Sequence, residues 1–172
     1  MRLFVAVQLN SAVKEALKKL QSDMRALGVR GSCTREENLH LTIAFIGEWP
    51  DPNAVLEALK NVSFDPFTVS TDGAGHFGDL WWAGIEGTEP LNGLAEQIRG
   101  ALAAADINFD KKRFRPHITL IRRAVWRDDR LRELQVPKVR MTVDRFCLMR
   151  SDRGSHGMVY TEIGSVYARP QG

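Results

Sequence analysis

The chain has 172 residues, of which 44% are hydrophobic and 26% are charged, and its formal net charge is +3. These values are ordinary for a compact globular protein with a substantial core, so we expect a single domain over residues 1–172. The apolar runs are far too short to span a bilayer and no signal peptide is visible, which predicts a cytoplasmic protein with no membrane partner.

Hydrophobic periodicity divides the first half of the chain into alternating strands and helices. Asn10 or Ser11 can cap the first helix, and Gly28 ends it. The second helix opens at the Pro50-Asp51-Pro52 turn. In chain order, the expected elements are a strand over Arg2–Gln8 that is buried on both faces, a helix up to Leu27, a polar loop over Gly31–Asn38, a strand over His40–Ile46 and a helix from Pro52 to about Lys60.

The second half predicts one more helix among several strands. Pro90 fits the first turn of this helix, whose apolar face runs from Leu91 to Ala105. Trp81 and Trp82 point to opposite faces of their strand, which places one in the core and leaves the other for a cleft. In chain order, the strands are Phe64–Thr71 and Leu80–Glu86 around a glycine-rich loop over Gly73–Gly78, then His117–Ile121, and finally Lys138–Arg150 and Met158–Ala168, joined as a hairpin by a longer loop across Ser151–Gly157.

Two copies of one short pattern dominate the chain, His40-Leu41-Thr42-Ile43 and His117-Ile118-Thr119-Leu120. In an extended strand, residues i and i+2 share a face, so each histidine lies beside its threonine while the aliphatic residues face the core. Such a strand offers a small polar site on a stiff support. Two of them brought together would place two imidazoles and two hydroxyls around one substrate.

The two copies lie 77 positions apart (117 − 40), and the same offset relates their surroundings. Leu3–Val7 corresponds to Leu80–Gly84, and Leu17 in the first helix corresponds to Leu94 in the third. The matching context predicts an internal duplication. Together with the order of the elements, it predicts an α+β fold of two similar lobes.

The paired motifs suit acid–base cleavage of a cyclic phosphodiester. One imidazole would activate water and the other would protonate the leaving oxygen, because the ordinary pKa of histidine, about 6.5, allows both near neutral pH. Thr42 and Thr119 would donate hydrogen bonds to the non-bridging oxygens. No carboxylate lies within either motif, and the sequence contains no HExxH, cysteine cluster or nucleotide-binding P-loop, so we expect neither a metal nor a cofactor.

Basic residues gather around the second motif. Residues 1–86 carry 8 basic and 11 acidic side chains, whereas residues 87–172 carry 16 and 10. Lys111–Arg132 alone holds nine basic residues against two acidic ones, and arginine supplies 17 of the 24 basic residues of the chain. Arginine suits bidentate recognition of phosphate, although a basic run is also the ordinary composition of a solvated face.

Phe45 and Arg122 each lie five positions after a motif histidine and therefore correspond under the duplication. Stacking on a base and pairing with a phosphate are the substrate-binding roles considered for them. Strict alternation would put Arg123 on the face of His117, so either arginine needs a bend or twist in the strand to reach the cleft. Four other residues of reactive type receive no role: His76 and His156 as exposed polar residues, and Cys33 and Cys147 as free thiols.

With these motifs in place, the chain resembles the two-histidine phosphoesterase superfamily, and more narrowly the bacterial and archaeal RNA 2′,3′-cyclic phosphodiesterases, historically called 2′-5′ RNA ligases. The resemblance covers most of the chain, and the paired motifs in this order are highly specific. The segments that carry it are Arg2–Val7, Asn38–Glu48, Leu80–Gly84, Phe114–Arg122, Phe146–Ser151 and Val159-Tyr160.

The resemblance implies a bilobal α+β fold of two pseudo-symmetric lobes, each with an antiparallel-type sheet and flanking helices, and an active-site cleft between them. It also implies an enzyme that opens a terminal RNA 2′,3′-cyclic phosphate to a 2′-phosphomonoester without a metal or nucleotide cofactor. It assigns His40 as the proton donor and His117 as the proton acceptor. RNA ends or cyclic nucleotides are then the expected partners, and we expect a monomer with no obligate protein partner. Two alternatives stay open: a phosphodiesterase or 2′-5′ ligase acting on other cyclic or 2′-5′-linked nucleotides, and a non-catalytic RNA-binding module.

Overall fold

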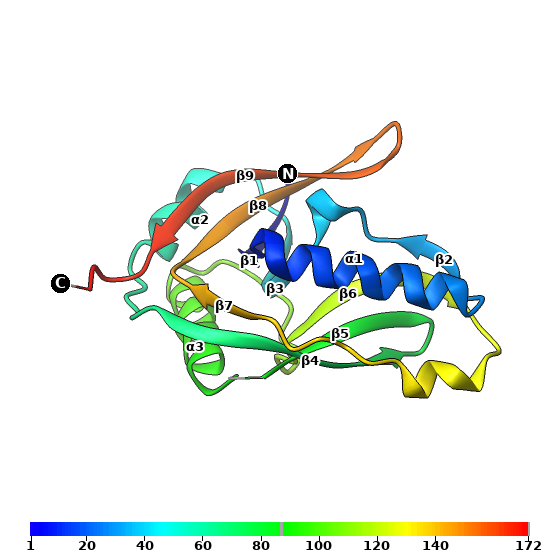
Figure 1. The fold of residues 1–172 in the computed structure, drawn as a ribbon. Coiled ribbons are helices and arrows are strands. Elements are labelled where there is room, and N and C mark those ends of the chain that lie inside the picture. Colours follow the sequence, from blue (N-terminus) through cyan, green and yellow to red (C-terminus); the bar gives the residue numbers. More distant parts are fainter. Residues whose placement is uncertain (87, 172) are drawn as a thin grey trace.

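Two antiparallel β-sheets form the framework of the computed structural model, which describes residues 1–86 and 88–171 (Figure 1). The four-stranded sheet has the order β3-β1-β8-β9, with β3 over His40–Glu48, β1 over Arg2–Gln8, β8 over Arg145–Gly154 and β9 over Gly157–Tyr167. The five-stranded sheet has the order β2-β6-β5-β4-β7, with β2 over Arg30–Cys33, β6 over His117–Val125, β5 over Leu80–Glu86, β4 over Phe67–Phe77 and β7 over Arg140–Val143.

Three α-helices in the described part of the chain cover these sheets, and the predicted α+β class is confirmed (Figure 1). Helix α1 (Ser11–Ala26) packs against β6, and Asn10 caps it by accepting a 2.9 Å hydrogen bond from the Val13 amide. Helix α2 (Pro52–Leu59) contacts α3 and β9, and α3 (Thr88–Ala104) contacts β3 and β4. None of the described helices is long and apolar enough to cross a membrane.

Strand β1 is buried on both faces, as its sequence predicts. Leu3, Val5 and Val7 belong to the main hydrophobic core, which continues under the helices and both sheets. Phe4 and Ala6 point the other way into a small second cluster. The other members of that cluster are Cys147 and Met149, with Tyr160 packed against them. Strand β1 therefore supports the four-stranded sheet from its centre and supplies an apolar backing to its neighbour β3.

Two segments that the sequence predicts as loops contain strand residues, so those predictions are wrong in part. The Gly31–Asn38 segment begins within β2, which pairs with β6, and ends in a 3₁₀ turn over Glu36–Asn38. The Gly73–Gly78 segment is mostly the second half of β4, which pairs with β5 as far as Phe77. Strand β2 depends on hydrogen bonds to β6, which lies far away in the sequence, and the second half of β4 pairs with the next strand, β5. A local turn-type composition reveals neither pairing.

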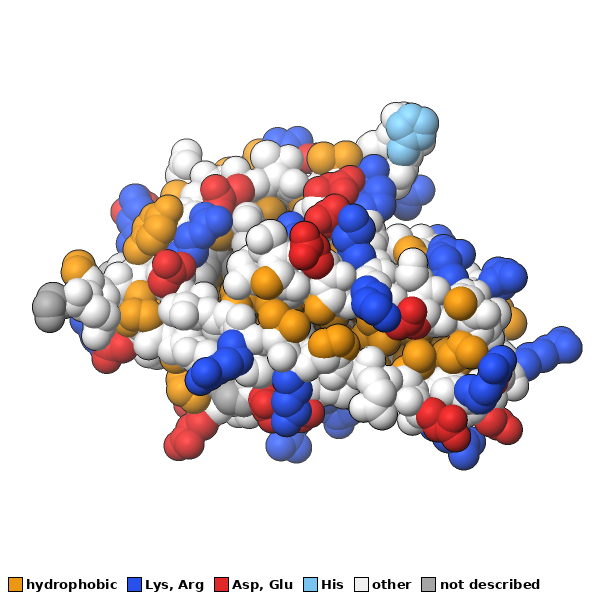
Figure 2. Space-filling view, viewed as in Figure 1, with side chains coloured by type: hydrophobic (Ala, Val, Ile, Leu, Met, Phe, Trp, Pro, Cys, Tyr) orange, Lys and Arg blue, Asp and Glu red, His pale blue; other side chains and the backbone are white. Residues whose placement is uncertain are grey.

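The predicted strand over Lys138–Arg150 is also wrong, because it is two strands. Strand β7 ends at Val143 in the five-stranded sheet, and β8 begins at Arg145 in the other sheet. Likewise, the longer hairpin loop expected across Ser151–Gly157 is replaced by strand pairing up to Gly154 and Gly157. The β8–β9 hairpin consequently projects as a long arm beyond the body of the molecule (Figures 1 and 2).

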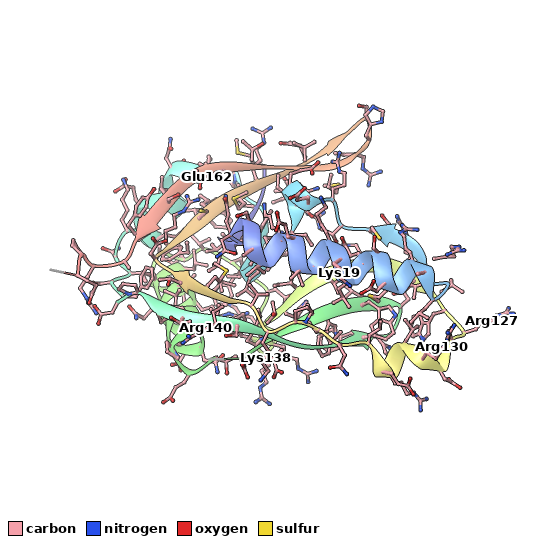
Figure 3. The ribbon with its side chains drawn as sticks, viewed as in Figure 1. Lys19, Arg127, Arg130, Lys138, Arg140 and Glu162 are labelled. Carbon is pink, nitrogen blue, oxygen red and sulfur yellow. The ribbon has the colours of Figure 1, made fainter. Side chains whose placement is uncertain are left out.

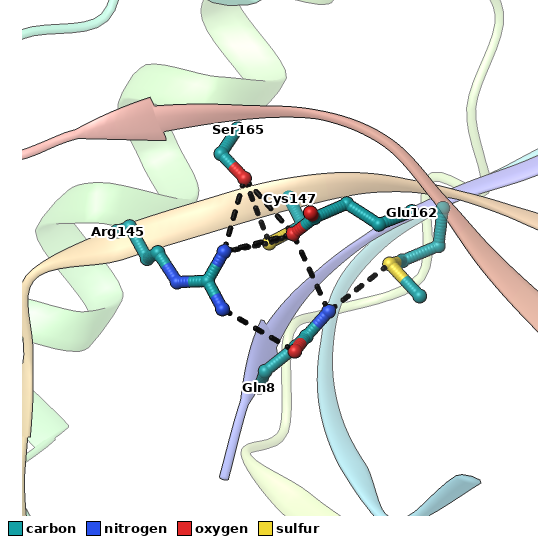
Figure 4. A network of polar contacts seen from close by, with 6 residues as sticks. Gln8, Arg145, Cys147, Glu162 and Ser165 are labelled. Atoms are coloured by element: carbon teal, nitrogen blue, oxygen red, sulfur yellow. Dashed lines mark hydrogen bonds and ion pairs between the residues drawn. The ribbon is translucent and has the colours of Figure 1, made fainter. Parts of the chain in front are cut away.

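A polar network fixes the base of this arm (Figure 4). Arg145 donates to the Glu162 carboxylate at 2.8 Å, and the Cys147 thiol donates to the same oxygen at 2.9 Å. Burial, the largest cause, and the Glu162 carboxylate raise the pKa of Cys147 to about 11, so this thiol stays protonated at neutral pH. Cys147 and Cys33 are both free, as predicted.

Candidate active site

The two motif strands lie side by side at the junction of the two sheets, because β3 of one sheet contacts β6 of the other. Between them opens a cavity of about 510 Å³, which we call the central cavity. All four polar motif residues line it, His40 and Thr42 from β3 and His117 and Thr119 from β6. The structure thus brings together groups that lie 77 positions apart in the sequence (117 − 40).

The two imidazoles are oriented in the same way. The Nδ1 atom of His40 lies 2.6 Å from the Asn38 carbonyl oxygen, and that of His117 lies 2.7 Å from the Arg115 carbonyl oxygen. Because a carbonyl oxygen can only accept, each Nδ1 carries the proton and donates. In the neutral ring, Nε2 is therefore the basic atom of both histidines and the one available for proton transfer.

The two Nε2 atoms have different surroundings. That of His40 lies 2.8 Å from the Thr42 hydroxyl, within hydrogen-bonding distance. That of His117 forms no hydrogen bond with any residue in the ranges 1–86 and 88–171. Burial is the main cause that lowers the pKa of His40, and the nearby charges of Arg122, His117 and Lys14 add to it, while the Asn38 carbonyl opposes them. In the free protein, the neutral form of His40 is therefore favoured.

Aromatic side chains fix both imidazole rings. Phe4 of β1 and Tyr160 of β9 lie against His40, with ring centroids 5.0 Å and 5.2 Å from it. Phe77 of β4 meets His117 edge-on at 5.4 Å. Each histidine is thus held by a backbone carbonyl on one side and an aromatic ring on another, which restricts the ring to one orientation.

The lining of the central cavity is strongly basic. Arg35, Arg122, Arg123 and Arg153 contribute to it, and no aspartate or glutamate does. Both arginines of β6 reach it, which the sequence left undecided. Strand β6 bulges between Thr119 and Ile121 and turns again at Arg123, whose φ of +51° is unusual for a side-chain-bearing residue. These two irregularities supply the bend that strict alternation lacks.

Two residues considered for the cleft lie elsewhere. Phe45, 36% exposed, does not line the central cavity, and the Arg2 guanidinium lies 5.1 Å above its ring. Trp81 is the buried member of its pair, as one of the two was predicted to be, and Trp82 lines a separate hollow beside His117. The structure therefore brings Arg122 to the motif residues but leaves Phe45 outside the lining.

The arm formed by β8 and β9 is the part of the site that the sequence analysis missed. Its tip contributes Arg153, His156 and Met158 to the cavity lining. Two side chains that precede β3 fasten it, because Arg35 and Asn38 donate to the Met158 carbonyl oxygen at 2.6 Å and 2.9 Å. The buried Asn38 thus fixes the arm through its side chain and His40 through its carbonyl. The signal available in the sequence was the position of Asn38, two residues before the motif histidine His40.

A metal-binding cluster is not found near these residues. Within residues 1–86 and 88–171, no group of three or more histidine, cysteine, aspartate or glutamate side chains is placed to hold a metal ion. The chemistry available in the central cavity is that of two imidazoles, hydroxyl donors and guanidinium groups. These groups can move protons at Nε2 and bind the oxygens of an anion.

Residues 9–155 match the model of the 2′-5′ RNA ligase superfamily. The chain belongs to that superfamily. A Thermotoga maritima RNA 2′,3′-cyclic phosphodiesterase is 29% identical, over 93% of this chain and 91% of that protein. A Thermus thermophilus protein of the same name is 32% identical, over 95% and 88%. The family that the sequence resembles is therefore confirmed.

Solved structures agree with this assignment. E. coli LigT in complex with 3′-AMP superimposes with a TM-score of 0.81 and 25% identity, over 98% of both chains. A protein from Thermus thermophilus, TT0787, gives a TM-score of 0.78 and 31% identity, over 97% of both chains. The likeness covers both sheets and both motif strands, so the whole bilobal framework of this chain is that of the family.

Proposed function

We propose that this protein hydrolyses the 2′,3′-cyclic phosphate at an RNA end to a 2′-phosphomonoester, by general acid–base catalysis from two histidines and without a metal ion. The observation that carries the proposal is the shared orientation of His40 and His117, each with Nδ1 held by a carbonyl, which leaves Nε2 as the atom for proton transfer in one basic cavity. The relatives named above supply the substrate class.

Two proton transfers accompany the hydrolysis. His117 Nε2 takes a proton from a water molecule as the water oxygen forms its bond to phosphorus. The bond from phosphorus to the 3′ oxygen breaks, and His40 Nε2 donates a proton to that oxygen. The products are a 3′ hydroxyl and a 2′ phosphate. Because His40 Nε2 contacts the Thr42 hydroxyl in the free protein, the leaving oxygen must replace this contact before the transfer.

The hydroxyls and arginines of the central cavity bind the phosphate. Thr42 and Thr119 donate hydrogen bonds to the non-bridging oxygens, where negative charge is stabilised in the transition state. Arg122 and Arg123 add charge-assisted donors from the end of β6. A lining with four arginines and no acidic side chain favours an anion over a neutral ligand.

The lowered pKa of His40 opposes the role of proton donor in the free protein, because a donor must be protonated. Burial is the main cause and the Arg122 charge adds to it. An anionic phosphate in the cavity offsets the positive charge of the arginines and favours the protonated ring. The substrate itself therefore helps to charge the proposed acid.

The experiment is incubation with an RNA oligonucleotide ending in a 2′,3′-cyclic phosphate, with and without excess chelator. We expect equal rates in both, with the product phosphate on the 2′ oxygen when the terminal nucleotide is identified by chromatography. A loss of activity in chelator that a divalent ion restores would overturn the two-histidine mechanism. Binding of the RNA without turnover would favour the non-catalytic RNA-binding module instead.

A further inference from the structure

A second hollow adjoins the central cavity on the side of His117. It encloses about 430 Å³, and we call it the aromatic groove. Its lining includes Phe77, Trp82, Asn92, Arg113, Arg115 and His117. Of these, only His117 also lines the central cavity. The groove therefore begins at the side chain proposed to activate water and leads away from it across β4 and β5.

Phe77 and Trp82 form the floor of this groove. Their ring centroids lie 5.3 Å apart, and Phe77 is 41% exposed, so part of its ring is open to a ligand. The position of Trp82 depends on Gly75, because a Cβ atom at residue 75 would lie 2.5 Å from the indole ring. The absence of a side chain at Gly75 thus lets the indole lie across β4 and present an aromatic surface beside His117.

Basic side chains flank the floor without acidic partners. Arg113 and Arg115 are exposed, and neither forms an ion pair with the described carboxylates. Asp110, the nearest acidic residue in the sequence, instead accepts a 2.9 Å hydrogen bond from the Lys112 amide. The Arg115 guanidinium lies 5.9 Å from the centroid of Phe77, so charge and aromatic surface occur together.

The segment that carries these arginines is tied to helix α3. Arg99 of α3 donates to the Lys112 carbonyl oxygen at 2.8 Å, and its guanidinium lies 5.9 Å from the ring of Phe114. This anchor holds the backbone on both sides of Arg113. The groove is therefore bordered by a fixed segment that presents two unpaired cations, beside a platform of two aromatic rings.

We propose that the aromatic groove binds the nucleotides of single-stranded RNA that precede the terminal cyclic phosphate. A base stacks on Phe77 and Trp82, and the preceding phosphates lie against Arg113 and Arg115. Exposed aromatic rings combined with basic side chains are the usual means of holding a single strand without sequence preference. The inference rests on the proposed function, since it fixes the direction of a strand whose 3′ end lies at His117.

The first test compares substrates of different length. For the unaltered protein, we expect kcat/KM to rise from a 2′,3′-cyclic mononucleotide to a tetranucleotide with the same end. In Phe77→Leu and Arg113→Ala, the ratio of tetranucleotide to mononucleotide kcat/KM should fall by about 5- to 50-fold, the scale of one lost stacking or phosphate contact. Leucine at residue 77 keeps an apolar contact with His117 while removing the ring.

The matched control is Arg140→Ala. Arg140 is an exposed arginine on β7, outside both the central cavity and the aromatic groove (Figure 3). We expect this variant to keep both the ratio and the rate of the unaltered protein. If both groove variants hydrolyse the substrate but keep the ratio of tetranucleotide to mononucleotide kcat/KM unchanged, the groove does not bind RNA. The proposed function would not be affected by that result.

A second test measures binding without turnover. An RNA tetranucleotide with a 3′-terminal phosphate carries 2-aminopurine at the penultimate position, where stacking quenches its fluorescence. We expect quenching by the unaltered protein, less quenching by Phe77→Leu, and a smaller salt dependence of binding for Arg113→Ala. If the protein fails to hydrolyse cyclic phosphates, the fluorescence still tests whether the aromatic groove binds RNA. Equal quenching and equal salt slopes for all variants would reject it.

Discussion

Ile43 of β3 and Leu120 of β6 are the extra residues of two β-bulges, each placed three positions after a motif histidine. Ile43 falls between Thr42 and Ala44, which pair with successive residues of β1, and Leu120 falls between Thr119 and Ile121, which pair with successive residues of β5. Both side chains are fully buried. The bulges change the alternation of each strand directly after its polar pair, so residues beyond them no longer follow the simple two-residue period. The internal duplication stays a prediction, and these paired bulges support it.

Replacement of either motif histidine by alanine should lower kcat for an RNA 2′,3′-cyclic phosphate by roughly 10²- to 10⁴-fold, the usual contribution of a positioned acid or base. The double variant His40→Ala/His117→Ala should be little slower than either single one, because the two groups act as a unit. Steady-state kinetics measure all three.

The control for this prediction is His76→Ala. His76 is exposed and lies outside the central cavity, against the rings of Trp81 and Trp126. This variant should keep turnover within a few-fold of the unaltered protein. Near-normal turnover in His40→Ala or in His117→Ala would instead show that the replaced residue is structural.

Thr42→Val and Thr119→Val should each lower kcat/KM by roughly 10- to 10³-fold, since each loses one donor to the phosphate while valine keeps the shape. The two variants should differ in their pH profiles. Only the Thr42 hydroxyl lies within hydrogen-bonding distance of a motif imidazole, so Thr42→Val should also shift the pH dependence of kcat/KM. A matching shift in Thr119→Val would contradict this asymmetry.

Gln21 fixes the bulge in β6 and offers a test of its importance. Its side-chain amide, buried on α1, donates to the carbonyl oxygens of Leu120 and Thr34, both at 2.9 Å. Gln21→Leu would leave the Thr34 carbonyl without this donor, whereas the Leu120 carbonyl would keep the Thr34 amide, which donates to it at 2.9 Å. We expect a loss of about 1–3 kcal/mol in the free energy of unfolding, the cost of one unsatisfied buried polar group. Urea titration measures it, and a loss below about 0.5 kcal/mol would mean that water replaces the amide.

The sequence could predict the parts of this protein that depend on local pattern. Helix α1, its Asn10 cap, the doubly buried strand β1 and the two polar motifs all follow from periodicity and residue type. It could not predict what depends on distant pairing. Strand β2 exists because β6 offers a partner, and the glycine at position 75 serves the indole of Trp82 rather than a turn.

Stability should depend on pH through His40. Burial is the main cause that lowers the pKa of His40 in the folded protein, so below its ordinary value of about 6.5 the unfolded chain binds more protons. The stabilisation that neutral His40 contributes is therefore complete above pH 6.5, and it is lost as the pH falls through the lowered pKa of His40 in the folded protein. Thermal unfolding between pH 7 and pH 5 should show a falling Tm, with a shallower slope in His40→Gln.

Two ion-paired carboxylates stay ionised across this window. The Arg169 side chain holds the pKa of Asp65 below its usual range, and Arg130 does the same for Asp128, so both titrate at lower pH. Inorganic phosphate should reduce the slope of the unaltered protein, because an anion in the central cavity favours protonated His40. An identical slope in His40→Gln would assign the pH dependence to other groups.

Two variants of Arg123 distinguish the effect of its side-chain charge from the effect of its backbone strain. Its φ of +51° lies in the left-handed region, where a residue with a Cβ atom is less stable by about 1–2 kcal/mol. Arg123→Ala removes the charge and keeps this strain, whereas Arg123→Gly removes both. We expect the glycine variant to be more stable than the alanine variant by about 1 kcal/mol in urea titration.

Both Arg123 variants should weaken inhibition by inorganic phosphate by roughly 10-fold, the scale of one hydrogen bond from a charged group. Arg140→Ala should leave that inhibition unchanged. Equal stability of the two Arg123 variants would show that the positive φ causes no strain. Unchanged phosphate inhibition in both variants would show that Arg123 does not bind the anion.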